Sequence, residues 1–377
     1  MLKISIRPQL LLEGPDKVRR PLLQLVELLT SVHEIGHLAG AARKLGVSYR
    51  HAWGVIKQGN QAFGAPLMTM TRGRGATLTA LGRKLLWANK RIGARLAPTL
   101  DSLASELEVE MERVLPDSKP AIRIHASHGF AMELLRDFLV AQHLPVELKY
   151  CGSMEALASL VGSNCEVAGF HVPIGDLQGA VLRFYLKWLK PESQTLINLA
   201  TRRQGIMTTP GNPKGILSIA DLAKPGIRFV NRQFGSGTRI LLDLLLKRDN
   251  VDSRKIAGYE SGETTHSGVA AYIASGMADA GFGVEPGARR FNLEFIPVAS
   301  ERYFLVCHNE SLTSTMVTRI RRILLSKQYR AAASNLPGVD VTQAGSVLSI
   351  RDAFPDLFEK TGTAPRTPSR KNLLLKD

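Results

Sequence analysis

Residues 36–64, GHLAGAARKLGVSYRHAWGVIKQGNQAFG, decide how the N-terminal part of this chain folds. The segment HLAGAARKLG has small apolar residues at helical spacing and ends on Gly46, a residue type that commonly stops a helix. Ser48 is a suitable N-cap for the next segment, YRHAWGVIKQGNQAF. Two short helices joined by a tight glycine-containing turn predict a helix-turn-helix. We expect three residues on the buried side of its second helix: Trp53, Ile56 and Phe63.

The flanking segments extend this unit. PLLQLVELLTSVHEIG, before it, has apolar residues at helical spacing, namely Leu22, Leu25, Val26, Leu29 and Val32. APLMTMTRGRGATLTALGRKLL, after it, predicts strands at 67–71 and 76–79 around a glycine-rich turn, which is a β-hairpin wing. The opening segment MLKISIRPQLLLEG alternates apolar and polar residues, so it predicts a further strand.

The charge of the chain is uneven. The net charge is +16, and residues 1–100 hold 16 Lys/Arg against 4 Asp/Glu. From Arg43 to Arg95 there are 11 basic residues and no acidic ones. A solvated helix face normally mixes charge signs, because like charges repel. A long field of one sign indicates a polyanionic partner.

Double-stranded DNA fits this charge better than a membrane surface. A membrane-binding helix needs a continuous apolar face, which this segment lacks, so we expect no membrane partner. In a helix-turn-helix, the second helix enters the major groove with its N-terminal residues first. The expected DNA-binding residues are Arg43, Ser48, Tyr49, Arg50, His51 and Lys57, with Arg72 and Arg74 at the tip of the wing.

The segments GAARKLGVSYRHAWGVI and FGAPLMTMTRGRGATLTALGRKLL resemble the DNA-binding domain of the ModE family of molybdate-responsive winged-helix regulators. The related LysR family shares this architecture, although SYRHAW is closer to the ModE form. In both families a long dimerising helix follows the wing, so the resemblance implies a homodimer or homotetramer. Residues 79–115 fit such a helix, bent or divided at Pro98, with apolar residues at helical spacing: Leu81, Leu85, Ile92, Leu96, Leu103 and Leu107.

The second half of the chain predicts an α/β domain. After a stiff linker, PDSKPA (116–121), strand-like and helix-like segments alternate, as in AIRIHAS followed by FAMELLRDFLV, and GIRFVNR followed by SGTRILLDLLLKRDN. Such alternation indicates parallel strands in βαβ units. A loop after FHVP and the late strand RYFLVCH suggest two lobes with crossovers between them.

Polar loops follow several of these strands. Open α/β sheets bind ligands at the carboxyl ends of their strands, and RQFGSGTR (232–239) opens a helix with bare N–H groups and hydroxyls, which suits an anion. It is not a P-loop, because the Walker spacing and lysine are absent. The expected ligand-binding residues are Ser127, His128, Ser153, Arg202, Arg232, Ser236, Gly237, Thr238, Arg239 and His266. Asp279, in GMADAGFGV, would repel an anion, so we expect a lobe-facing or capping role for it.

Residues 122–312 resemble the periplasmic-binding-protein-like domain of prokaryotic regulators, which is also attached to some molybdopterin enzymes. The resemblance rests on GSMEALASLVGSNCEVAGFHVP, RQGIMTTPGNPKGILSIADLAKPGIRFVNRQFGSGTR and YESGETTHSGVAAYIASGMADAGFGVEPGARRFNLEFIPVASERYFLVC. It implies a two-lobed type II fold with a central ligand cleft.

We therefore expect an α/β chain in four parts: a winged helix-turn-helix (1–90), a dimerisation helix and linker (91–120), a periplasmic-binding-protein-like effector domain (121–340) and a partly disordered C-terminal extension (341–377). SVLSIRDAFPDLF in that extension predicts a small helix on a lobe or a partner subunit. Neither a signal peptide nor a membrane-length apolar run occurs, so we expect a cytoplasmic protein. The three cysteines lack metal-site spacing, so we expect free thiols and no metal or cofactor.

The sequence favours a ligand-responsive transcriptional regulator. It shows no G-x-S-x-G or HExxH motif, and Ser127, His128, His171, His266 and Glu285 are scattered, so an enzyme is a distant alternative. Both resemblances point to molybdenum or tungsten metabolism, with molybdate, tungstate or a molybdopterin species as effector. A LysR-like regulator of an organic carboxylate or phosphate metabolite is the other alternative, because arginines in the cleft suit a larger ligand.

Overall fold

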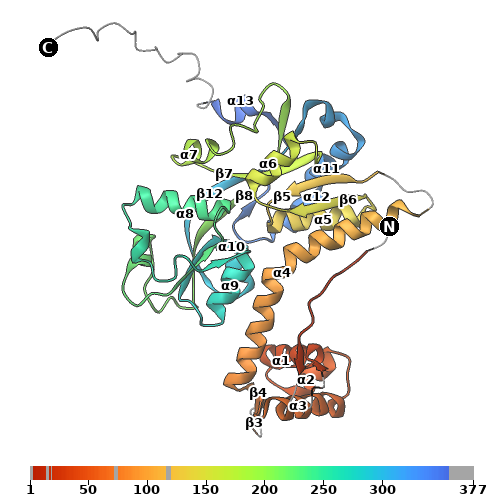
Figure 1. Ribbon diagram of the computed structural model, residues 1–377, viewed down its shortest axis with the longest axis vertical. Helices are drawn as coiled ribbons and strands as arrows, with labels where there is room; N and C mark the ends of the chain where they lie inside the picture. The colour runs from red at the N-terminus through yellow and green to blue at the C-terminus, as the bar shows by residue number, and fades with distance from the viewer. Residues whose placement is uncertain (1–2, 14–16, 18, 72–74, 116–119, 356–377) are drawn as a thin grey trace, which may run out of the picture.

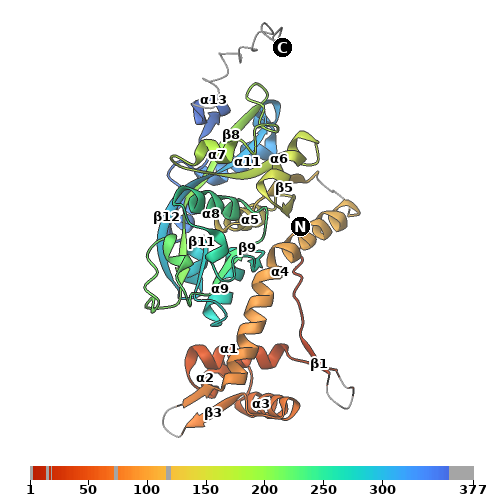
Figure 2. The same cartoon turned by 60° about the vertical axis from the view of Figure 1, so that its left-hand side comes forward.

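The computed structural model describes residues 3–13, 17, 19–71, 75–115 and 120–355. It consists of a small N-terminal head, a long helix and a larger α/β body (Figures 1 and 2). The predicted fold class, a winged helix-turn-helix joined to a two-lobed α/β domain, is confirmed.

The head is a winged helix-turn-helix. Its elements are α1 (Leu23–Ile35), α2 (Leu38–Lys44), α3 (Tyr49–Phe63), β3 (Met68–Thr71) and β4 (Gly75–Leu78). The Ser48 hydroxyl caps α3 by accepting the backbone N–H of His51 at 3.1 Å. The apolar residues predicted for the first helix, from Leu22 to Val32, are buried against α2 and α3. The tip of the wing, with Arg72 and Arg74, lies outside the described residues.

The N-terminal segment is not the strand that its alternation predicted. Residues 3–10 have no regular secondary structure, and β1 (Leu11–Glu13) pairs only with the equally short β2 (Arg19–Pro21). A strand needs a neighbouring strand to bond its backbone. Here the N–H of Ile4 donates instead to the Glu108 carboxylate at 2.7 Å, so the segment lies along the long helix (Figure 1).

This long helix, α4 (Ala80–Arg113), joins the head to the body. The sequence left open whether Pro98 bends the helix or divides it. α4 stays continuous through Pro98, and its two halves run in different directions (Figure 1). Proline causes such bends because it cannot donate to the carbonyl four residues earlier. Residues 116–119 of the predicted linker lie outside the described part of the chain.

The body is built on one sheet with the strand order β10-β9-β11-β8-β12-β7-β5-β6, and β13 and β14 also pair with β8. We call the part around β5, β6 and β7 lobe 1 and the part around β9, β10 and β11 lobe 2. β8 and β12 are antiparallel partners over nearly their whole length and pass through both lobes. The strands are β5 (Ile122–Ala126), β6 (Val146–Tyr150), β7 (Val167–Pro173), β8 (Gln194–Thr208), β9 (Phe229–Arg232), β10 (Gly262–Glu263), β11 (Ala280–Val284), β12 (Glu294–His308), β13 (Val339–Asp340) and β14 (Val347–Ser349).

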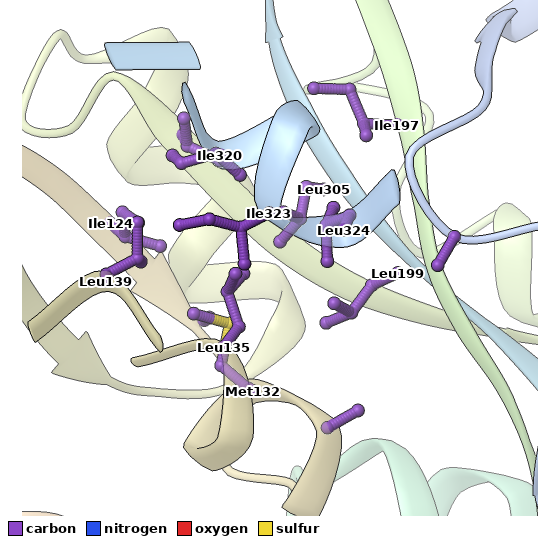
Figure 3. Close-up of a cluster of buried hydrophobic side chains, with 14 of the residues drawn as sticks. Ile124, Met132, Leu135, Leu139, Ile197, Leu199, Leu305, Ile320, Ile323 and Leu324 are labelled. Atoms are coloured by element: carbon purple, nitrogen blue, oxygen red, sulfur yellow. The ribbon is translucent and has the colours of Figure 1, made fainter. Parts of the chain in front are cut away.

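Helices cover the sheet of each lobe. Those of lobe 1 are α5 (Phe130–Ala141), α6 (Ser153–Val161), α7 (Gln178–Leu182), α11 (Thr315–Leu325), α12 (Lys327–Ser334) and α13 (Ile350–Ala353). Those of lobe 2 are α8 (Gly237–Arg248), α9 (His266–Ala274) and α10 (Glu285–Arg290). In lobe 1, the apolar faces of α5 and α11 meet over the sheet, where Leu135 of α5 lies close to Ile323 of α11 (Figure 3). This packing holds the loops at the strand ends in place.

The end of the described chain packs on lobe 1. β14 pairs with β8, and α13 is followed by Phe354, whose ring lies edge-on to that of Phe304 at 5.7 Å between centroids. The sequence predicted a small helix here that packs on a lobe or on a partner subunit, and in the structure α13 packs on lobe 1. The tail predicted to be disordered, 359–377, lies outside the described residues, which end at residue 355.

Candidate effector cleft and DNA-binding face

A cavity of about 520 Å³ lies between the two lobes. Polar loops reach it because strands β5, β6 and β9 end there and α6, α8 and α9 begin there. Their free N–H groups and positive helix ends favour an anion. Of the residues predicted to bind ligand, the structure brings together at this cavity Ser127, His128, Ser153, Arg202, Arg232, Ser236, Gly237, Thr238 and His266.

Arg239 is the exception, and its expected place in the cleft is wrong. It lies one turn into α8, where its Nε is 3.0 Å from a carboxylate oxygen of Asp243. Its Nη1 donates to the carbonyl of Tyr259 at 3.1 Å, and the guanidinium lies 3.9 Å from the centre of the Tyr259 ring. The helical turn that directs Thr238 into the cleft directs its neighbour away from it.

Two arginines of the cleft differ in their partners. The Nε of Arg202 donates to Oε1 of Glu301 at 2.5 Å, and Gln204 donates to the same oxygen and to the Thr238 hydroxyl, both at 3.0 Å. The charge of Arg202 is therefore neutralised within the protein, and the Thr238 oxygen already accepts a hydrogen bond.

Arg232 lies at the end of β9 without such a partner. Its side chain is buried, and its Nε has no hydrogen-bond partner among the residues described. Burial lowers the pKa of Arg232 to about 9, and the nearby positive charge of Arg202 adds to this effect, while the carboxylates of Glu263 and Glu301 oppose it only in part. A buried cation that lacks a direct hydrogen-bonded partner is costly, so an anion in the cleft would stabilise it.

Neutral polar groups surround Arg232. Desolvation, with the charges of Arg202 and Arg232, holds the pKa of both His171 and His266 well below the usual range. His171 Nε2, His266 Nδ1 and the Tyr150 hydroxyl are buried and lack hydrogen-bond partners in the described structure. Burial also raises the pKa of Tyr150, so this hydroxyl keeps its proton and can donate. These groups supply several hydrogen bonds to a bound molecule without adding charge.

Sequence reasoning missed some of these groups. Tyr150 ends β6, two residues before the predicted Gly152–Ser153 loop, and this position could have revealed it. His171 lies within the buried strand β7, where the sequence shows no loop. Arg95, Pro98 and Thr99 of α4 also line the cavity, although the sequence assigned this helix to dimerisation alone.

Two further expectations are resolved around the cleft. Asp279 does not line the cavity; its carboxylate accepts the backbone N–H of Arg228 at 2.9 Å and pairs with the Arg228 guanidinium at 2.7 Å. All three cysteines are free. No group of three or more potential metal ligands occurs within the described ranges.

The surface formed by the end of α2 and by α3 presents the predicted DNA-binding residues. Among those that the structure describes, Arg43, Ser48, Tyr49, Arg50, His51 and Lys57 are all exposed. Trp53 was expected in the core of the head, and this is wrong, because 46% of the residue is exposed. It shares a helix face with Tyr49 and Lys57, at spacings of four residues, whereas Ala52 and Ile56 face the core.

An apolar stripe runs along α4. Leu81 and Leu85 pack against the head, but four apolar residues further along are exposed: Leu96, Leu103, Leu107 and Met111. No described helix is both long and apolar enough to cross a membrane.

Comparisons with known families cover both halves of the chain. Residues 137–325 match the PBP superfamily domain. Residues 23–83 match the helix-turn-helix of bacterial regulatory proteins of the lysR family. Both matches agree with the domains seen in the structure.

Individual proteins resemble parts of this chain at moderate or low sequence identity. Uncharacterized protein YvgK of Bacillus subtilis (strain 168) is 30% identical over 247 residues, 65% of this chain and 79% of that protein. Molybdenum-pterin-binding protein MopB of Rhodobacter capsulatus is 35% identical over 94 residues, 24% of this chain and 35% of MopB. Among solved structures, an H2O2-bound mutant of OxyR from Corynebacterium glutamicum is 16% identical, with 84% of this chain and 94% of that chain covered and a TM-score of 0.43.

Proposed function

Because this chain belongs to the regulators that join a LysR-family helix-turn-helix to a PBP superfamily domain, we propose that an anion bound in its cleft controls how its head binds DNA. The protein is a ligand-responsive transcriptional regulator and not an enzyme. We expect it to act in the cytoplasm, where its DNA partner is found.

The observation that carries the anionic effector is Arg232. It is a buried cation whose Nε has no hydrogen-bond partner among the described residues, and it lines a cavity to which three helix N-termini also contribute. Tyr150, His171 and His266 offer hydrogen bonds around it. An anion would satisfy these groups together, whereas a cation would meet Arg232 with the wrong sign.

For the identity of the effector, we propose molybdate, tungstate or a molybdenum-cofactor species. The partial match to a molybdenum-pterin-binding protein supports this choice. Hydroxyls and backbone N–H groups at helix N-termini also suit a tetrahedral dianion without full countercharge. Ser127, Ser153, Ser236 and Gly237 supply such groups at the cavity.

The size of the cavity favours a larger anion as the second candidate. A tetrahedral oxyanion displaces only a few water molecules of about 30 Å³ each, and the cavity measures about 520 Å³. A bare oxyanion would therefore need the lobes to close around it. A pterin phosphate, or another organic phosphate or carboxylate, would fill more of the open cleft.

Calorimetry on the full chain distinguishes these effectors. The panel is molybdate, tungstate, sulfate, phosphate and a pterin phosphate. We expect Arg232→Gln to abolish binding of the ligand that the parent binds. The control Arg228→Gln removes an exposed arginine paired with Asp279 outside the cleft and should leave binding intact. Tight molybdate binding supports the oxyanion, and binding of the pterin phosphate alone assigns the larger anion. Binding that survives Arg232→Gln would contradict the proposed site.

For the head, we propose that α3 enters the major groove and that the wing contacts the DNA backbone. The exposed positions of Tyr49, Arg50, His51 and Lys57 support this, as does the absence of acidic residues from Arg43 to Arg95. Arg43 and Ser48 lie beside the start of α3, and Arg72 and Arg74 belong to the wing.

We further propose a homodimer or homotetramer held by α4. The exposed apolar stripe Leu96, Leu103, Leu107 and Met111 supports a second copy as the partner, because a solvated helix seldom keeps such a stripe uncovered. Sedimentation of the parent and of Leu103→Glu with Leu107→Glu tests it, since only the parent should exceed the monomer mass.

A further inference from the structure

The long helix α4 is part of the effector cleft as well as the support of the head. Arg95, Pro98 and Thr99 line the cavity together with residues of both lobes. A ligand in the cleft therefore lies against the helix that carries the DNA-binding head.

The N-terminal half of α4 is bonded to lobe 2. The Thr265 hydroxyl donates to the carbonyl of Ala94 at 2.8 Å, and the Thr264 hydroxyl donates to the carbonyl of Arg95 at 3.1 Å. The Arg95 guanidinium also pairs with Glu263 at 3.0 Å. This half of the helix is thus held by the loop that opens α9.

The C-terminal half of α4 is bonded to lobe 1. The Ser105 hydroxyl donates to the carbonyl of Val146 at 3.1 Å and accepts the N–H of Leu148 at 2.9 Å. The Ser102 hydroxyl accepts the N–H of Tyr150 at 2.9 Å. Both serines therefore bond to β6, the outermost strand of the sheet on this side, so this half moves with lobe 1.

Pro98 lies between the two attachments. Because proline has no N–H, the Ala94 carbonyl loses its usual bond within the helix, and this carbonyl is the one that Thr265 binds. The same Thr265 hydroxyl accepts the N–H of Gly268 at the start of α9. On the other side of the bend, the Ser102 hydroxyl donates to the Pro98 carbonyl at 2.8 Å.

We propose that α4 forms the third wall of the effector cleft and that Pro98 is the hinge through which closure of the lobes turns the DNA-binding head. The proposal rests on the function proposed above. When the lobes approach each other, the two halves of α4 must change their angle, because each half is held by a different lobe. Residues 80–97 span about 27 Å of helix, so a turn of about 10° at Pro98 moves the head by about 5 Å.

Bridging the lobes chemically tests the hinge without any effector. Glu155 on lobe 1 and Phe234 on lobe 2 both line the cavity and are exposed. The full-length variant for the test is Glu155→Cys with Phe234→Cys, in which Cys151→Ser removes the native thiol that also lines the cavity, and it is treated with bis-maleimides of increasing length. DNA affinity is measured by fluorescence anisotropy before and after bridging. We expect bridging by a short reagent to change DNA affinity at least about fivefold, the lower range of allosteric coupling.

Adding Pro98→Ala to this variant should remove most of the response, so that DNA affinity before and after bridging differs by no more than about twofold. Each variant is compared with its own unbridged form, so a change in basal affinity cancels. Pro225→Ala, at an exposed proline before β9, is the matched control and should keep the full response. Forms that carry only one of the two introduced cysteines control for simple alkylation.

Thr265→Val provides a second variant, because it removes the hydroxyl that binds Ala94, and Thr265→Ser should restore the response. An equal response with and without Pro98 would overturn the hinge, as would unchanged DNA affinity in the bridged Glu155→Cys with Phe234→Cys variant. A failure of this variant to bind DNA before bridging would instead contradict the proposed function.

Discussion

The DNA-binding face of the head and the effector cleft both depend on arginine, but in opposite environments. Arg43 and Arg50 of the head are exposed, so water solvates their charges and keeping them costs little. Arg202 and Arg232 of the cleft are buried, where each charge must be compensated. Binding by the head therefore depends on how many basic side chains it presents. Binding by the cleft depends on which group pairs with each buried arginine.

The largest expected difference between the two regions is how strongly salt weakens the binding of their ligands. If the head makes six to ten phosphate contacts, DNA affinity should fall by about 10³- to 10⁵-fold between 50 and 200 mM salt, because counterions are released on binding. The anion that binds the cleft should lose less than about tenfold, since buried charges are screened less. Anisotropy and calorimetry across a salt series measure both slopes. Similar slopes would refute the contrast.

Breaking the ion pair of the cleft should cost stability. Glu301→Gln leaves Arg202 buried without a countercharge, and we expect the free energy of unfolding to fall by about 3–5 kcal/mol in urea denaturation. Glu260→Gln is the matched control, because the Glu260 side chain is 89% exposed and should cost about 0–1 kcal/mol. Equal losses in the two variants would show that the Arg202–Glu301 pair is not specially stabilising.

Within the head, arginines on α3 and on the wing should differ in kind. Arg50→Ala should reduce discrimination at one base pair by about 1–3 kcal/mol, because we propose that the start of α3 faces the base edges. Arg74→Ala should weaken all DNA sequences about equally. Competition with a set of single-base-pair operator variants measures both effects. Equal losses of affinity and specificity in the two mutants would contradict the docking of α3 in the major groove.

Trp53→Ala should have the smallest effect on folding. Because Trp53 is exposed, we expect the free energy of unfolding to change by less than about 0.5 kcal/mol. Ile56→Ala, three residues later on the buried side of α3, should cost about 2–5 kcal/mol. Thermal and urea unfolding of both variants provide the measurement. A large loss of unfolding free energy for Trp53→Ala would show that Trp53 packs in the core.

Local patterns in the sequence were sufficient to predict most of the helices and strands of this protein, although not the N-terminal segment, whose alternation predicted a strand that does not form. Helical spacing and the Ser48 cap predicted α1 to α3. The alternating patterns predicted that strands and helices follow one another along the chain in the body. The polar loops at strand ends predicted most of the cleft, because the carboxyl ends of parallel strands meet at one edge of a sheet. These features depend on residues close together in the chain.

The tertiary structure decided which side chains are paired and which are not. Glu301 neutralises Arg202 from 99 residues away, while Arg232 has no such partner among the described residues, and nothing in their local sequences distinguishes the two arginines. The same holds for α4, whose place in the cleft depends on hydroxyls of lobe 2 more than 160 residues distant. Trp53 shows a further limit: helical spacing predicts that one face is buried, but the packing of α1 and α2 decides which residues that face includes.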